Sequence, residues 1–154
     1  MREPCDIEVI GTQLDWRNFE IFVESAFSSF GFQTTRNVRL RKPPTEIDLV
    51  ATRNGLCFAV DCKHWKRTAG HGAMLRISSR QIIRAKRLLA ERNHNEIIPI
   101  IVTLHDESLQ ILENGVPIVP IHSISSFLLE WEIERNRITI LSNREERAKQ
   151  SRLR

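Results

Sequence analysis

One dipeptide, Asn54-Gly55, lies between two apolar runs and constrains the fold of this chain more than any other feature. Asn-Gly favours a two-residue type I′ hairpin turn, because both central residues of that turn take positive φ. The turn also fixes the pairing of the two flanking strands, so that, counting outward, Asp48 faces Asp61. The sequence therefore predicts two carboxylates directly opposed on neighbouring strands.

The opposed carboxylates are expected to lie beside a lysine. Side chains alternate along a strand, so Asp48, Asp61 and Lys63 share one face, whereas Cys57 and Cys62 point to opposite faces and do not form a zinc site together. Directly opposed Cβ atoms lie about 5 Å apart, where like charges repel. Apolar strands of this kind are covered on both faces, and charge is retained there mainly when it is paired or binds metal. A divalent cation between the carboxylates is one interpretation, and a solvated hairpin end is the other.

The remaining periodicity predicts alternating helices and strands. Apolar residues at three- and four-residue spacing predict a helix over residues 16–30 and a second helix over 73–92, with a break near Ser78 and Ser79. A third helix is expected over 123–131. Strands are expected over 32–40, 46–53, 56–63, 96–104 and 116–121. This order predicts an α/β domain whose mixed sheet carries helices on both faces.

The spacing of the charged residues matches a known pattern. Asp48, twelve intervening residues, and then Asp61-Cys62-Lys63 resembles the PD-(D/E)xK nuclease superfamily. With Glu20 on the first helix, the pattern is similar to the Mrr-type restriction endonucleases and the archaeal Holliday-junction resolvases. Ile47 stands where the name-giving proline would be, and Asp61 replaces the commoner glutamate. The resemblance covers roughly residues 15 to 130 and implies a three-layer α/β/α restriction-endonuclease-like fold with a central mixed sheet.

The resemblance also implies a site and an activity. The implied activity is a metal-dependent DNA endonuclease of the restriction or repair and recombination type, which uses Mg²⁺ or, in its place, Mn²⁺. Lys63 would orient the attacking water, and Gln81 would lie beside the site. The implied metal ligands are Asp48, Asp61, the carbonyl group of Cys62 and, directly or through water, Glu20. DNA is the implied partner, and a homodimer is one arrangement that cuts two strands.

Two other functions fit the same residues. One is a nuclease-fold module without turnover, which binds nucleic acid or has a structural role, because fold alone does not decide function. The other is a metalloenzyme that acts on a different substrate class. Retention of both acids and the lysine favours the nuclease.

The charge balance agrees with a polyanionic partner. The formal net charge is +4 and the sequence pI is about 9.3. The candidate DNA contacts are Arg39, Arg41, Lys42, Trp65, Lys66, Arg67, Arg80, Arg84 and Arg87. For Trp65, closing the edge of the core is an equal alternative, and for the arginines the alternative is a solvated surface.

Length and composition bound the rest. The 154 residues predict a single nuclease-like domain over 1–142 and a charged tail over 143–154. The three cysteines include no CxxC pair, so no disulfide framework is indicated. No secretory leader is evident, and the longest apolar run, 97–104, is shorter than the roughly 20 residues that cross a bilayer. We therefore expect a soluble, cytoplasmic protein with no membrane partner.

Overall fold

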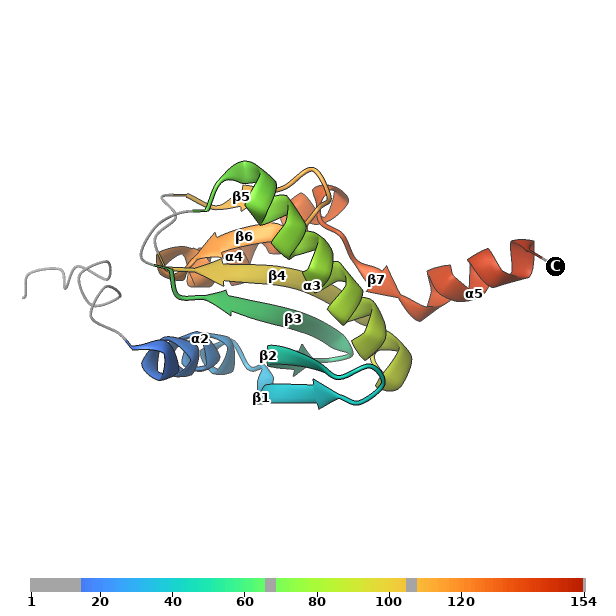
Figure 1. Ribbon diagram of the computed structural model, residues 1–154, viewed down its shortest axis with the longest axis horizontal. Coiled ribbons are helices and arrows are strands. Elements are labelled where there is room, and N and C mark those ends of the chain that lie inside the picture. Colours follow the sequence, from blue (N-terminus) through green and yellow to red (C-terminus); the bar gives the residue numbers. More distant parts are fainter. Residues whose placement is uncertain (1–14, 66–68, 105–107, 154) are drawn as a thin grey trace, which may run out of the picture.

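The structure is a mixed seven-stranded sheet covered by helices (Figure 1). It is a computed structural model that describes residues 15–65, 69–104 and 108–153. The strand order is β1-β2-β3-β4-β6-β5, with β7 paired to β4. The β1-β2, β2-β3, β4-β7 and β5-β6 pairs are antiparallel, whereas the β3-β4 and β4-β6 pairs are parallel. The predicted central mixed sheet is confirmed.

The long predicted elements are all present with small shifts at their ends. The strands are β1 (Gln33–Leu40), β2 (Thr45–Arg53), β3 (Leu56–Lys63), β4 (Glu96–Thr103), β5 (Gln110–Ile111), β6 (Pro117–Pro120) and β7 (Leu141–Ser142). The helices are α2 (Trp16–Ser29), α3 (His71–Glu91), α4 (Ile124–Glu130) and α5 (Asn143–Arg152), with 3-10 turns η1 (Ile121–Ser123) and η2 (Trp131–Arg137). The short strands β5 and β7 and the 3-10 turns η1 and η2 were not predicted.

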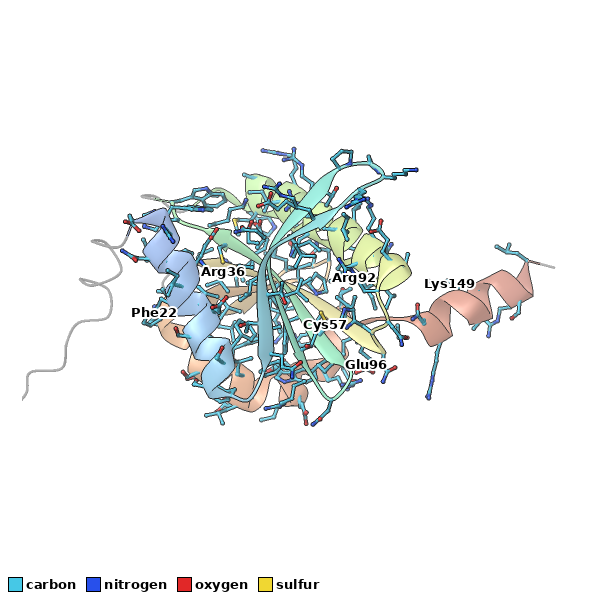
Figure 2. The ribbon with its side chains drawn as sticks, turned by 90° about the horizontal axis from the view of Figure 1, so that it is seen from below. Phe22, Arg36, Cys57, Arg92, Glu96 and Lys149 are labelled. Atoms are coloured by element: carbon cyan, nitrogen blue, oxygen red, sulfur yellow. The ribbon has the colours of Figure 1, made fainter. Side chains whose placement is uncertain are left out.

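The helices cover both faces of the sheet and form three layers. Figure 2 shows α2 and α3 on opposite sides of the strands. One core cluster lies between the sheet and α2 and α4, and it includes Cys62. A second cluster lies under α3 and includes Cys57. The two cysteines are therefore on opposite faces, as the strand alternation predicts.

Phe58 is the centre of the larger cluster and is fully buried. Its ring centroid lies 5.7 Å from that of Phe27, 5.5 Å from Phe32, 5.9 Å from Phe127 and 5.8 Å from Trp131, mostly edge to face. Aromatic pairs in this geometry add about 0.5–1.5 kcal/mol each beyond the burial of their area. These contacts join α2, Phe32 just before β1, α4 and η2 to β3, the strand that carries Asp61 and Lys63.

The β2-β3 hairpin has the predicted turn. Asn54 has φ 51° and Gly55 has φ 81°, the positive values that a type I′ turn requires. The pairing runs from Arg53 with Leu56 to Leu49 with Val60, in the predicted register. The Gly55 carbonyl accepts hydrogen bonds from two successive backbone N–H groups at the start of β4, at 3.2 and 3.3 Å. The turn is therefore fixed to the neighbouring strand.

The ribbon formed by β1 and β2 changes face along its length. Asn37, in the middle of β1, has φ 52°, a left-handed conformation that asparagine tolerates better than most residues. Before it, Arg36 points to α2 and forms an ion pair with Glu24 at 3.2 Å (Figure 2). After it, Val38 packs into the cluster under α3. Residues two apart on a regular strand share a face, so the alternation is reset at Asn37.

The partner strand changes face at the corresponding position. Ile47 lies in the cluster under α3, whereas Leu49 lies in the cluster under α2. Asp48 lies between them, and the β1-β2 register places it opposite Asn37. The reversal therefore coincides with the first predicted carboxylate.

The α3 helix is continuous, so the predicted break near Ser78 and Ser79 is wrong. Ser78 is fully buried, and its hydroxyl donates to the Leu75 carbonyl at 2.9 Å. The same hydroxyl accepts a hydrogen bond from the Asn114 side chain at 2.7 Å. A serine that would compete with the helix is satisfied within it and by a neighbouring loop.

The C-terminal helix α5 extends away from the layered body (Figure 1). It follows β7 directly, and the described side chains near its end, including Lys149 and Arg152, are exposed. The described part of the charged tail is therefore helical. Within the described ranges, no helix combines the length and the apolar character that a bilayer crossing needs.

Candidate active site

The pairing of β2 with β3 stops at Leu49 and Val60, just before the predicted carboxylate pair. Beyond this point the Asp48 Oδ2 atom accepts the backbone N–H of Cys62 at 2.8 Å. In a continued ladder that N–H would face Ile47. A side-chain carboxylate therefore takes the place of a strand-to-strand hydrogen bond, which holds Asp48 against β3 where the two strands part.

Asp61 lies on β3 and is 4% exposed. Lys63 Nζ is 3.1 Å from its Oδ2 atom, and Arg84 Nη1 is 3.4 Å from its Oδ1 atom. Oδ2 is paired with Lys63 by charge and has no hydrogen bond among the described residues. Two cations thus flank one buried carboxylate, one beside each of its oxygens.

Gln81 connects α3 to the same strand and is fully buried. Its Nε2 atom donates to the Ala59 carbonyl at 2.9 Å, and its Oε1 atom lies 3.4 Å from Arg84 Nη1. Ala59 and Asp61 are two residues apart on one face of β3. The glutamine is therefore fixed beside the carboxylate by a hydrogen bond to the sheet.

Glu20 approaches from α2 and is 9% exposed. Burial raises the pKa of Glu20 above its ordinary value. Across residues 15–65, 69–104 and 108–153, no three histidine, cysteine, aspartate or glutamate side chains converge closely enough to hold one metal ion. The contribution of Glu20 to a metal site, directly or through water, stays a prediction.

Burial and nearby charges penalise ionisation of Asp48. The pKa of Asp48 is raised to about 6, mainly by burial and also by the negative charges of Asp61 and Glu20, against the Cys62 hydrogen bond and Lys63. Burial, with the same three carboxylates, also raises the pKa of the Cys62 thiol well above its ordinary range. The thiol is therefore neutral, and only the peptide group of Cys62 can serve the site.

These groups are of the kind that could hold a divalent cation. Mg²⁺ is bound by oxygen atoms, often from one or two carboxylates, and keeps several of its waters. Asp61 supplies a buried oxygen without a hydrogen-bond partner, and Asp48 supplies a carboxylate whose charge lacks full compensation. A divalent cation would give this Asp61 oxygen a partner and would compensate the charge of Asp48.

The predicted DNA-contacting residues near the β1-β2 loop and after β3 differ in their exposure and in their contacts. Arg41 and Lys42 are exposed in the loop between β1 and β2, and Arg39 is exposed but lies 3.5 Å from Glu46. Trp65 is partly buried against a third core cluster, formed by Met74, Ile101, Leu112, Val116 and Ile118, which corresponds to closing the edge of the core. Lys66 and Arg67 lie outside the described residues.

The arginines of α3 do not form a uniform exposed row. Arg80 is exposed, and no ion pair to it occurs within the described ranges. Arg84 contacts Asp61, and Arg87 donates to the Thr45 hydroxyl and lies 3.4 Å from Glu91. Sequence reasoning missed the contact of Arg84 with Asp61. The three-residue spacing of Gln81 and Arg84, which places both on one helix face, was the available signal.

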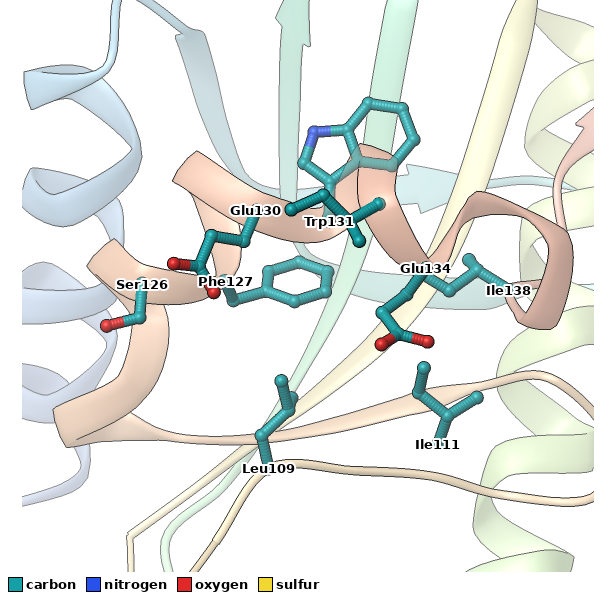
Figure 3. Close-up of a pocket in the computed structure, with 9 residues that line it drawn as sticks. Leu109, Ile111, Ser126, Phe127, Glu130, Trp131, Glu134 and Ile138 are labelled. Carbon is teal, nitrogen blue, oxygen red and sulfur yellow. The ribbon is translucent and has the colours of Figure 1, made fainter.

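A separate apolar pocket of about 140 Å³ lies beside α4 and η2 (Figure 3). It is lined by Leu109, Ile111, Ser126, Phe127, Glu130, Trp131, Ile133, Glu134 and Ile138. None of the predicted site residues borders it. This apolar pocket is therefore distinct from the charged site at the end of the β2-β3 ladder.

Comparison with known proteins gives a family, a relative and similar solved structures. The family model Mrr_cat, described as a restriction endonuclease, matches residues 12–97, a range that contains Glu20, Asp48, Asp61, Lys63 and Gln81. An uncharacterized protein of Archaeoglobus fulgidus is 29% identical over 115 residues, which are 73% of this chain and 88% of the relative.

Two solved structures are also similar to this chain. One is a crystal structure of a protein of unknown function, AF1548, with 22% identity and a TM-score of 0.45 over 58% of this chain and 48% of the other. The second is the protein VC1899 from Vibrio cholerae, with 14% identity and a TM-score of 0.41 over 73% of this chain and 32% of the other. The chain therefore spans about half of the first solved chain and about a third of the second.

Proposed function

The chain belongs to the Mrr_cat restriction endonuclease family, and from this premise we propose that it is a metal-dependent endonuclease that hydrolyses phosphodiester bonds of DNA. The observation that carries the proposal is the convergence of Asp48, Asp61 and Lys63 where the β2-β3 pairing stops. The metal is Mg²⁺, and Mn²⁺ can replace it. The alternative is a nuclease-fold module that binds DNA without cleaving it.

The proposed metal ligands are Asp48, Asp61 and the carbonyl group of Cys62, with Glu20 acting through water. The N–H and C=O of one strand residue point to the same neighbouring strand. Because Asp48 accepts the N–H of Cys62, the carbonyl group of that residue also points toward β2. When bound, the ion polarises the scissile phosphate and lowers the pKa of a bound water.

The protein side chains position the reaction. Lys63 Nζ, 3.1 Å from Asp61, is held beside the carboxylates, where an ammonium group can orient the attacking water and balance negative charge that develops on the phosphate. Gln81 holds α3 against β3 through the Ala59 carbonyl, which keeps the helix beside the strand that bears the site.

The proposed DNA contacts are the cations on the exposed surface around the site. Phosphate contacts fix the position of a protein on the duplex and dominate its affinity. The described residues proposed for this role are Arg39, Arg41, Lys42 and Arg80, and Lys66 and Arg67 remain candidates from the sequence.

A cleavage assay tests the proposal. Plasmid, junction and flap DNA are incubated with the purified protein and Mg²⁺, Mn²⁺ or a chelator. Lys63→Ala should lower the cleavage rate roughly 100-fold or more and leave DNA affinity nearly unchanged. Lys86→Ala, at an exposed position on α3, is the matched control.

Two results would count against the proposal. Cleavage by Lys63→Ala at the wild-type rate would remove the role of the lysine. Metal-independent DNA affinity without cleavage of any DNA form would favour the binding module.

A further inference from the structure

Arg84 makes an unusual contact with the buried carboxylate of Asp61. Its Nη1 atom is shared between Asp61 Oδ1 and Gln81 Oε1, each 3.4 Å away. Charge-assisted hydrogen bonds between cationic N–H groups and carboxylates are usually about 2.7–2.9 Å long. The Arg84 side chain is 31% exposed, whereas that of Asp61 is 5% exposed. A partly exposed guanidinium therefore reaches a buried carboxylate through long, weak contacts.

The second cation at Asp61 is held differently. Lys63 lies on the same strand as Asp61, its side chain is 23% exposed, and its Nζ atom also lies 5.9 Å from the centre of the Trp65 ring. Arg84 comes from another element, is more exposed and has the longer contact. Of the two cations, Arg84 is the one that can leave without disturbing the strand.

A divalent ion at the site would meet this guanidinium. An ion held by Asp61 would stand close to both Lys63 and Arg84, and like charges at such distances repel strongly in a partly buried site. Resting on the proposed function, we propose that Arg84 is a positioning residue whose guanidinium lies beside Asp61 in the metal-free protein, at the position that a divalent ion would take. Binding of the ion displaces this guanidinium. Because Arg84 and the metal ion compete for Asp61, the affinity for metal is lower than it would be without Arg84.

The neighbouring arginines supply matched comparisons. Arg80 lies one turn earlier on α3 and is exposed, and no contact with Asp61 occurs for it within the described ranges. Removing its charge changes the net charge by the same amount as removing that of Arg84. The difference between the two variants therefore isolates the contact with Asp61.

Calorimetric titration of Mn²⁺ into the DNA-free protein tests the proposal. Arg84→Gln should bind Mn²⁺ about tenfold more tightly than wild type, which corresponds to about 1.4 kcal/mol. Arg80→Gln should stay within about twofold of wild type, and Arg84→Lys, which keeps a cation, should lie closer to wild type than Arg84→Gln does.

The outcomes separate this proposal from the proposed metal site. Mn²⁺ binding by all proteins with equal affinity for Arg84→Gln and Arg80→Gln would overturn the role of Arg84 alone. Absence of Mn²⁺ binding to any of the proteins would overturn the metal site, and the displacement with it.

A measurement on the wild-type protein keeps the proposal testable if Arg84→Gln does not fold. The side-chain Nε–H signals of the arginines are followed by NMR during titration with Mg²⁺, with Arg84→Lys used for assignment. The Arg84 signal should shift along the Mg²⁺ binding curve while the Arg80 signal stays constant. An Arg84 signal that stays unchanged while Mg²⁺ binds would overturn the proposal.

Discussion

The two ends of the β2-β3 hairpin are built from the same strands and differ in almost every physical property. At the turn end, Asn54 and Gly55 have the φ values that their turn requires, and every residue pair is in register. At the open end, the pairing stops, and a carboxylate replaces a backbone acceptor beside another buried carboxylate. Local preferences and packing agree at the first end and conflict at the second. Such conflicts are expected at functional sites, where the cost is retained for chemistry.

The largest expected effect tests the well-packed half of the hairpin. Phe58→Ala removes the fully buried ring that contacts four other aromatic rings, so the free energy of unfolding should fall by about 3–5 kcal/mol. Urea denaturation measures the change. Phe22→Ala, at a phenylalanine that is 39% exposed on α2, should cost less than about 1 kcal/mol. Similar losses for both would mean that Phe58 is not the centre of the core.

The turn itself gives the next largest effect. Gly55→Ala places a Cβ atom on a residue with φ 81°, at 2.5 Å from the Asn95 Nδ2 atom. The free energy of unfolding should fall by about 1–3 kcal/mol because the backbone is strained and Asn95 must move. Gly70→Ala is the control, because no described atom lies within 4 Å of its added Cβ. A thermal melt in which both variants match wild type would contradict the anchored turn.

The open end should respond in the opposite direction. Because the pKa of Asp48 is raised to about 6 in the folded protein, ionising it costs stability as the pH rises from about 4 to about 6, and the cost is complete above that range. Asp48→Asn removes this cost and keeps an oxygen that can accept the Cys62 N–H. Without metal, its free energy of unfolding at pH 8 should exceed that of wild type by about 1–2 kcal/mol, after discounting for solvent screening.

The pH dependence is the control for this prediction. The advantage of Asp48→Asn should shrink as the pH falls through about 4 and disappear below about pH 3, where Asp48 is protonated in both the folded and the unfolded wild-type protein. Asp61→Asn should instead lower stability at pH 8, because it leaves Lys63 and Arg84 without their carboxylate. Equal responses of the two variants would show that the carboxylates are equivalent.

The smallest expected effect concerns DNA affinity near the open end. Arg80→Gln should lower the salt dependence of DNA binding by a slope of roughly 0.9, the value for one duplex phosphate contact. Arg87→Gln should lower it less, because its guanidinium is already bonded to Thr45 and Glu91. Affinities measured from about 50 to 200 mM salt test both. A larger effect for Arg87 would mean that its internal contacts break when DNA binds.

Most of the fold was predictable because its signals are local. The Asn-Gly turn, the alternation along β3 and along β2 from Leu49 to Arg53, and the helical spacing of apolar residues act over a few residues, and the structure follows them. The continuous α3 was missed because Ser78 is satisfied by Asn114, a residue 36 positions away. The strand β7 was missed because two residues carry too little pattern, and its pairing partner is β4.

The sequence predicted the residues of the candidate site, but it did not predict how charge is distributed among them. The hairpin register placed Asp48 opposite Asp61, and strand alternation added Lys63. The sequence treats the two carboxylates as equivalent, whereas the structure gives Asp61 two cations and leaves Asp48 with the raised pKa. That asymmetry depends on how α3 crosses the sheet, which brings Arg84 to Asp61. No spacing within the hairpin contains this information.

The change of face at Asn37 and Asp48 divides the β1-β2 ribbon into two segments. The alternation of side chains between the two faces of the sheet is set separately in each segment. In an ordinary strand, inserting one residue turns every later side chain to the wrong side of the sheet. Here the outer segment, which includes Val38 and Ile47, is aligned with α3, while the inner segment is aligned with α2. Insertions and deletions in the Arg41–Pro44 loop therefore leave the alignment of the inner segment intact. Changes in the length of this loop would therefore not move the carboxylate at the base of the ribbon.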